Sequence, residues 1–112
     1  MNAAKMCHKW EKFIRVFDEE NRGRISRLGM FESHSDVVDD YWIKGGEPFT
    51  GMKLDLSGDL PAVEITVGDY VHPVHKLTHV SFRFGISGEE DGVDITDANG
   101  RTTVLRFEPE GC

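Results

Sequence analysis

The chain has 112 residues, the length of one domain, and its hydrophobic fraction of 38% together with 12 glycines is typical of globular proteins. Its formal net charge of −7 at pH 7 opposes binding to a phosphate backbone. Uninterrupted apolar runs reach only two or three residues, too few for a membrane span or a secretory signal. We therefore predict a single cytoplasmic domain over residues 1–112 that binds neither nucleic acid nor membranes.

The charge is unevenly distributed along the chain. Residues 1–30 carry a net charge of +3, and the remaining residues carry a net charge of −10. This asymmetry either serves solubility or allows one copy of the chain to associate with another. The two cysteines, Cys7 and Cys112, do not make a disulfide framework, and we expect both to be thiols in a reducing compartment.

Residues 3–20 have the period of an amphipathic helix. Apolar side chains recur at helical spacing along one face: Met6, Trp10, Phe13, Ile14 and Phe17. Residues 21–23 read Asn-Arg-Gly, and both Asn and Gly accept the left-handed conformation that ends many helices. We expect this helix to lie flat on a sheet.

After residue 23 the apolar pattern changes to the period of β-strands. Alternating segments span residues 24–33, 51–58, 62–69, 78–86, 92–96 and 101–109. The segments 51–58 and 62–69 are joined by a short connection with Gly58 and Pro61, which predicts an antiparallel hairpin.

A second hairpin is predicted near the C-terminus, with a register. Residues 97–100 read Asp-Ala-Asn-Gly, which suits a type I turn followed by Gly100 in the left-handed conformation. This turn places Ile95 opposite Thr103 and Val93 opposite Leu105, so that all four side chains share one face.

Residues 34–49 follow no single period, and we expect an irregular segment there. A short strand near residues 40–44 and a turn of helix both remain open. The predicted fold class is α+β, with one N-terminal amphipathic helix packed on an antiparallel, curved sheet of five or six strands over residues 24–109. One helix cannot cover such a sheet, so one face is partly solvated, or the sheet curls into a half-barrel, or a second copy covers it.

The whole pattern resembles a known family. The features that carry the resemblance are the helix with Trp10, Phe13 and Phe17, the turn EPFTGMKLD, the strand start LTHV and the terminal DGVDITDANGRTTVLRF. Over roughly residues 8–108, they resemble the small bacterial family catalogued as domain of unknown function 5335. The resemblance implies a bacterial, cytosolic, single-domain protein, and it transfers no activity.

Three histidines, His72, His75 and His79, lie within eight positions and raise the question of a metal site. Pro73 interrupts the segment, and the alternation after it predicts a strand in which His75, Leu77, His79, Ser81 and Arg83 share a face. In such a strand the Cα atoms of His75 and His79 lie roughly 13 Å apart, too far to bind one ion. We therefore predict no metal and no cofactor, and a histidine-bearing face that ends at Arg83.

Other catalytic patterns are weak. Ser81 shares the face of His79, but no nucleophile elbow and no placed acid accompany it, and the acidic residues 88–92 fit a solvated loop better than a calcium loop. Aromatic side chains in the middle of the chain either form a binding surface or close the open end of the sheet: Phe31, Tyr41, Trp42, Phe49 and Tyr70.

We predict an interaction or small-ligand-binding module without catalytic activity. The candidate binding residues are His75, His79, Arg83, Trp42 and Tyr41. A homodimer or another protein is the candidate partner, and the small molecule is not identified by the sequence. The alternative function is a metal-dependent or acid–base enzyme that uses the face with His75, His79 and Arg83.

Overall fold

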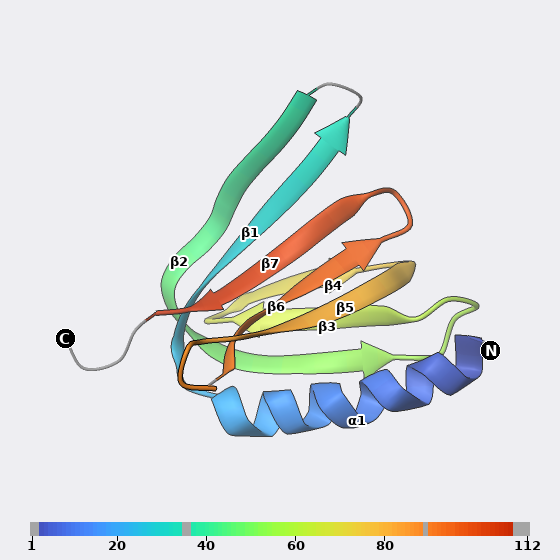
Figure 1. Ribbon diagram of the computed structural model, residues 1–112, viewed down its shortest axis with the longest axis horizontal. Coiled ribbons are helices and arrows are strands. Elements are labelled where there is room, and N and C mark those ends of the chain that lie inside the picture. The colour runs from blue at the N-terminus through green and yellow to red at the C-terminus, as the bar shows by residue number, and fades with distance from the viewer. Residues whose placement is uncertain (1–2, 35–36, 89, 109–112) are drawn as a thin grey trace.

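The structure is a computed structural model that describes residues 3–34, 37–88 and 90–108. It consists of one helix and an antiparallel sheet of seven strands in the order β4-β3-β2-β1-β7-β6-β5 (Figure 1). The elements are α1 (Ala3–Asn21), β1 (Ile25–His34), β2 (Val37–Asp55), β3 (Ala62–Val67), β4 (Tyr70–Val74), β5 (Leu77–Phe84), β6 (Glu90–Asp97) and β7 (Arg101–Phe107). The α+β class is therefore confirmed, and the prediction of five or six strands is too low.

The first correction concerns residues 34–49, for which an irregular segment was expected. Residues 37–55 form one long strand, β2, whose first part pairs with β1 and whose last part pairs with β3. Its registers shift around Ile43, Gly46 and Thr50, where β2 carries an extra residue relative to its partner. Each bulge reverses the alternation of side chains, so that no single period spans the strand. Gly46, with φ of 73°, has the left-handed conformation that such a bulge favours.

The second correction concerns β4. Pro73 was expected to interrupt the chain, but it lies inside β4 and opposite Glu64 of β3. Proline has no N–H to donate, which is harmless in a strand that has a neighbour on one side only, as β4 has at the end of the sheet.

The two predicted hairpins are confirmed. In the C-terminal one Val93 pairs with Leu105 and Ile95 with Thr103, as predicted, and Gly100 has a φ of 82°. The Asp97 carboxylate accepts hydrogen bonds from the backbone N–H groups of Asn99 and Arg101, at 2.9 and 3.0 Å, which fixes the turn.

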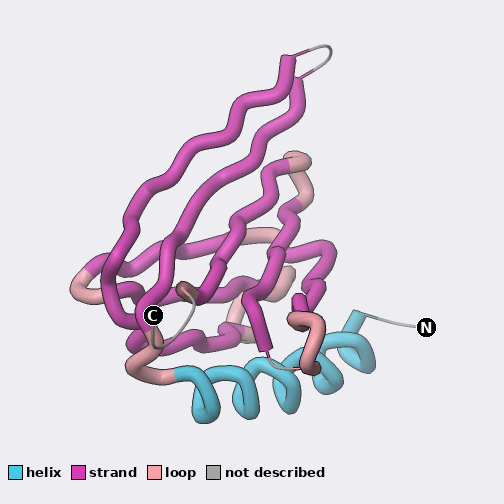
Figure 2. Tube along the Cα trace, turned by 60° about the vertical axis from the view of Figure 1, so that its left-hand side comes forward, coloured by secondary structure: helices cyan, strands magenta, loops and turns pink. Residues whose placement is uncertain are grey.

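The sheet bends around one hydrophobic core. The β1–β2 hairpin extends beyond the other strands, while β3 and β4 turn back across the inner side, and α1 runs along the base (Figures 1 and 2). A contact between β4 and β7 shows how far the sheet curls, because His72 Nε2 lies 3.1 Å from Thr103 Oγ1. The predicted curvature is thus present, and the sheet stays open between β4 and β5.

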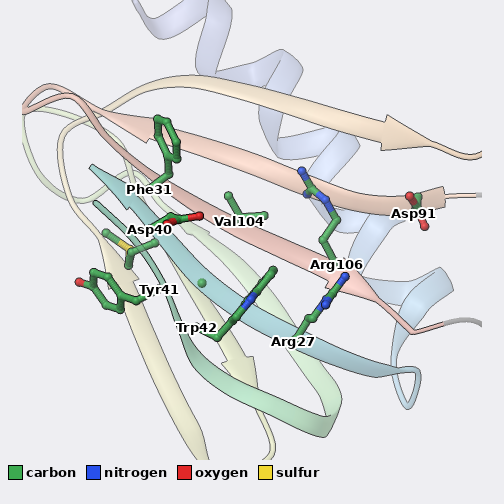
Figure 3. A pocket seen from close by; sticks show the side chains of 10 residues that line it. Arg27, Phe31, Asp40, Tyr41, Trp42, Asp91, Val104 and Arg106 are labelled. Atoms are coloured by element: carbon green, nitrogen blue, oxygen red, sulfur yellow. The ribbon is translucent and has the colours of Figure 1, made fainter. Parts of the chain in front are cut away.

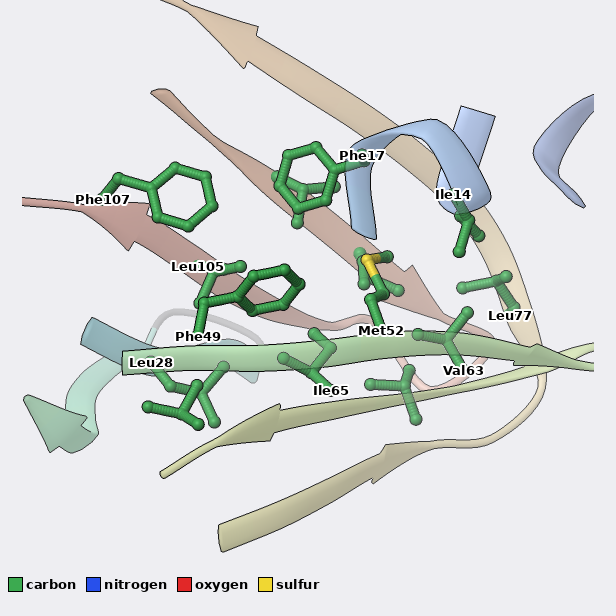
Figure 4. Packing of buried hydrophobic residues seen from close by; sticks show 14 residues of the cluster. Ile14, Phe17, Leu28, Phe49, Met52, Val63, Ile65, Leu77, Leu105 and Phe107 are labelled. Atoms are coloured by element: carbon green, nitrogen blue, oxygen red, sulfur yellow. The ribbon is translucent and has the colours of Figure 1, made fainter. Parts of the chain in front are cut away.

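The core lies between the inner face of the sheet and α1 (Figure 4). Phe17 of α1 meets Phe49 of β2 and Phe107 of β7, with ring centroids 5.8 and 5.6 Å apart. Ile14 is buried as predicted and Trp10 packs against the core, whereas Phe13 is half-exposed. The side chains of Met6 and Cys7, and the whole of Cys112, lie outside the described residues.

The Asp18 carboxylate fastens α1 to β2. Its Oδ1 accepts a hydrogen bond of 3.0 Å from the backbone N–H of Met52, just past the bulge at Thr50. Arg22, one helical turn later, donates two further hydrogen bonds to the same carboxylate, at 3.1 and 2.6 Å. The helix and the irregular part of β2 therefore share one buried acceptor.

We predict that Asp18→Ala lowers the free energy of unfolding by about 1–3 kcal/mol, because it leaves the buried N–H of Met52 without an acceptor. The ion pair with the exposed Arg22 accounts for little of this loss of unfolding free energy, because surface ion pairs are weak. Urea unfolding measures the effect, with Glu19→Ala on the exposed side of the same helix turn as the control. Equal unfolding free energies for the two variants would contradict the role of Asp18.

Candidate functional site

The face of the sheet that points away from the core, here called the outer face, belongs to β5, β6, β7, β1 and the first part of β2. Residues paired across neighbouring strands point to the same side, so the registers sort this face into cross-strand rows. Three of these rows carry the side chains considered below. The candidate site consists of the predicted binding residues that lie on the outer face and of the side chains that they contact there.

The first row contains three arginines and is called the arginine row. Arg83 pairs with Gly92, Gly92 with Arg106, and Arg106 with Arg27. Neighbouring strands lie roughly 5 Å apart, so Arg27 and Arg106 are direct neighbours and Arg83 lies about 10 Å beyond Arg106. Gly92 has no side chain, which leaves room between Arg83 and Arg106.

Asp94, in the second row, fills that room. Its Oδ1 lies 2.8 Å from Arg106 Nη1, and its Oδ2 lies 3.6 Å from Arg83 Nη1. Oδ1 is buried and receives no well-aligned hydrogen bond, so its contact with Arg106 is mainly one of charge. The single carboxylate of Asp94 thus contacts two guanidinium groups, and its one negative charge balances only one of their two positive charges.

The rest of the second row is apolar. Val104 pairs with Gly29 of β1, and Gly29 pairs with Trp42 of β2. The indole covers Gly29 so closely that a Cβ there would lie 2.7 Å from Trp42 Cε3. On its other side the indole receives the Arg27 guanidinium, 4.6 Å from the ring centroid, an arrangement that suits a cation–π contact.

These two rows form one side of a hollow of about 470 Å³ on the outer face (Figure 3). Arg27 and Arg106 lie close to the Trp42 side chain, and Val104 lies beside them. Phe31 and Asp40, which pair with each other in the third row, form the opposite end, and Asp91 lies at the rim near Arg106. The hollow therefore has a cationic end, an apolar middle and acidic margins.

Of the five predicted binding residues, three lie on the outer face: His79, Arg83 and Trp42. Tyr41 is exposed and pairs with Met30, on the other side of the hairpin from Trp42, yet it also lines the hollow (Figure 3). His75 is exposed in the connection between β4 and β5, away from this face.

The predicted common face of the residues from His75 to Arg83 is wrong. β5 begins at Leu77, whose side chain is buried and pairs with Asp97, and the register then shifts before His79. This bulge turns His79, Ser81 and Arg83 outward while Leu77 points into the core. The structure keeps His79 and Arg83 on one face and separates His75 from them.

His72 has a structural contact. It is partly buried on β4, and its two ring nitrogens lie 3.1 Å from Thr103 Oγ1 and 3.5 Å from the Tyr70 hydroxyl. Burial lowers the pKa of His72 below its usual value, and the nearby charge of Arg101 acts in the same direction. A neutral imidazole is therefore favoured in this contact.

No metal centre is present in the part of the chain that the structure describes, where no three His, Cys, Asp or Glu side chains are grouped to hold an ion. His79 lies in the third row, opposite Thr96, and the acidic residues of the outer face engage arginines or lie at its margins. The arrangement places guanidinium groups, which bind anions, beside apolar side chains.

Sequence reasoning missed Arg27, Arg106 and Gly29 as site residues. Arg106 could be assigned to the outer side of its strand from the alternation of residues 101–107, but nothing local shows that Arg27 lies beside it. Aromatic residues in the segment 34–49 gave the only signal for this site. Phe31 and Trp42 indeed lie exposed on the β1–β2 hairpin, whereas Phe49 is part of the core.

Comparisons of the chain with protein-family models, with curated proteins and with solved structures found no match. The resemblance to the family named above stays a prediction. Among the described residues no helix is long and apolar enough to cross a membrane.

We predict that Gly29→Ala displaces Trp42 and lowers the free energy of unfolding by about 1–3 kcal/mol, because the new methyl group would also meet the Tyr41 carbonyl oxygen at 2.9 Å. Gly45→Ala is the matched control, since its Cβ would meet no atom closer than 3.9 Å, and we expect a change within about 0.5 kcal/mol. Urea unfolding, with Trp42 emission followed in a Trp10→Phe background, measures both. Equal stabilities and unchanged emission would refute the close packing of Trp42 on Gly29.

Proposed function

We propose that the protein is a non-catalytic binding module that holds a small organic anion in the hollow of the outer face. The observation that carries this proposal is the arginine row beside Trp42. Guanidinium groups bind carboxylate and phosphate with two parallel hydrogen bonds, which makes arginine the common choice for such groups.

The local charge supports an anion at this place. The chain as a whole is acidic, with a net charge of −7. The guanidinium groups of Arg27, Arg83 and Arg106 nevertheless outnumber by one charge the carboxylates of Asp94 and Glu108 that approach them. Glu108 approaches Arg27 only to 3.9 Å, so it screens that guanidinium without saturating its donors.

The shape of the hollow indicates the rest of the ligand. Next to the arginines lie the exposed part of the Trp42 side chain and the side chain of Val104, which offer apolar surface. Asp40 and Asp91 at the margins repel further negative charge. We infer a ligand with one anionic group and a compact apolar body, and not a polyanion such as a nucleic acid.

The alternative of a metal-dependent or acid–base enzyme remains a hypothesis. It gains no support from the placement of His75 away from His79 and Arg83. The cytoplasmic location and the bacterial origin likewise stay predictions from the sequence.

The proposal can be tested by isothermal titration calorimetry with naphthalene carboxylate and, as a neutral probe of the same shape, naphthalene methanol. We expect the carboxylate to bind at least tenfold more tightly, a difference of about 1.4 kcal/mol. Arg27→Gln and Arg106→Gln should each weaken carboxylate binding roughly tenfold, and added salt should weaken it further.

Arg15→Gln is the control, because Arg15 is an exposed arginine on α1, which packs on the opposite face of the sheet from the arginine row. It should leave the affinity unchanged. The proposal fails if the neutral alcohol binds as tightly as the carboxylate, or if Arg15→Gln weakens binding as much as Arg27→Gln does. Arg27→Gln alone is sufficient for the test if Arg106→Gln disturbs folding. The side chain of Arg27 is half-exposed, so we expect its replacement to leave the fold intact.

A further inference from the structure

A second surface lies between α1 and the end strand β5. It is a groove of about 570 Å³, called here the edge groove. Its walls are mainly apolar, with Phe13 and Val16 on the helix and Val80, Phe82 and Phe84 on the strand. Four polar residues also line it: Lys12, His79, Ser81 and Glu90. Phe82 also touches the helix, with ring centroids 6.1 Å from Phe13 and 5.4 Å from Phe17.

Apolar side chains are left in water along this groove and next to it. Phe13, Val16 and Phe84 are 48%, 39% and 62% exposed, and Ile86, just after β5, is fully exposed. With roughly 200 Å² for each phenylalanine side chain, the two phenylalanines alone leave about 200 Å² in contact with water. Together with Val16 and Ile86 the exposed apolar surface reaches a few hundred Å², the range of the largest apolar patches on monomers, which are often functional.

The two edges of the sheet differ in how they are protected. β4, at one edge, is five residues long and contains Pro73. β5, at the other edge, is eight residues long and contains no proline. The N–H of Leu77, the first residue of β5, donates a hydrogen bond of 2.9 Å to the Pro61 carbonyl. Within the described residues, the rest of β5 pairs with β6 alone. The regular part of β5, residues 79–83, lies between two register shifts, and its unpaired edge is a template for another strand.

We propose that β5 pairs antiparallel with β5 of a second copy of the chain, about a two-fold axis at Phe82. In this register Phe82 faces Phe82 of the second copy, and Val80 faces its Phe84. The apolar side chains of each β5 then enter the edge groove of the other copy, where they contact Phe13 and Val16 of the helix. A patch that complements itself in this way is what a two-fold interface requires.

Charge selects this register over a neighbouring one. With the axis at Phe82, Arg83 lies opposite Ser81 of the second copy. With the axis shifted to Arg83, the two Arg83 side chains would lie opposite each other and repel each other. Pairing about Phe82 also places the two Phe82 residues directly opposite each other, and an aromatic pair in this position is favourable.

The size of the surface fits a second copy of the same chain. A standard interface buries roughly 800 Å² on each partner. The exposed apolar side chains supply a few hundred Å² of this, and the backbone edge of β5 and the walls of the groove are available for the rest.

Sedimentation velocity of the full chain over a roughly hundredfold range of concentration tests the proposal. We expect a dimer for the wild type and a monomer for Phe84→Glu, which puts a charge into the interface at a position that a monomer leaves exposed. Val71→Glu, at a half-exposed apolar residue of the opposite edge strand, is the matched control and should remain a dimer. A monomeric wild type, or a dimer that Val71→Glu breaks and Phe84→Glu does not, overturns the proposal.

Disulfide cross-linking tests the register. In a background with Cys7→Ser and Cys112→Ser, a chain with Ser81→Cys and a chain with Arg83→Cys are mixed and oxidised. Directly opposed residues have Cα atoms about 4.5–5.5 Å apart, within the range that a disulfide spans. We expect the mixture to cross-link and the Ser81→Cys chain alone to stay uncross-linked. Cross-linking of Ser81→Cys with itself would instead place the axis at Ser81 and contradict the register proposed.

Discussion

The bend of β2 over Phe49 is the constraint on which the rest of the structure depends. Phe49 is fully buried, and its ring contacts Phe17 of α1 and Phe107 of β7. On one side of this point β2 pairs with β1, and on the other side it pairs with β3. The three rings therefore connect the helix to both halves of the sheet, and the bulges around Phe49 allow one strand to serve both halves. Asp18 then holds the helix to β2 just beyond the bend.

The same packing determines which side chains the protein presents. The inward residues of β6 and β7, among them Val93 and Leu105, fill the core and fix the register of these strands. Once this register is fixed, the cross-strand neighbours of the outward residues are fixed as well. Arg106 must lie between Gly92 and Arg27, and Asp94 must lie next to it. The arginine row is thus a consequence of core packing on the opposite face of the sheet.

Sequence reasoning succeeded where one period continues through an element. The hairpin from Val93 to Leu105 was predicted with its register, because clean alternation meets a turn whose residues demand one geometry. It failed in β2, where bulges near Ile43 and Gly46 reverse the alternation, and in β4, where a proline is harmless only because the strand lies at the edge. Neither bulges nor edge positions can be read from a local pattern.

The candidate site was predicted in part for a similar reason. His79 and Arg83 were named from their local strand pattern and Trp42 as an aromatic residue in the middle of the chain, and all three lie on the outer face. The pairing of Arg27 with Arg106 joins strands from opposite ends of the chain, and only the assembled sheet reveals it.

We propose that the hollow beside Trp42 binds anions through the arginine row. A titration with naphthalene carboxylate, followed by ¹H–¹⁵N spectra of the arginine Nε–H and tryptophan indole groups, tests this at the residues concerned. We expect the signals of Arg27, Arg106 and Trp42 to shift and those of Arg15 and Trp10 on α1 to stay in place. If the Trp10 signal shifts and the Arg27 and Arg106 signals do not, the ligand binds near the helix, and the hollow of the outer face is not the anion site.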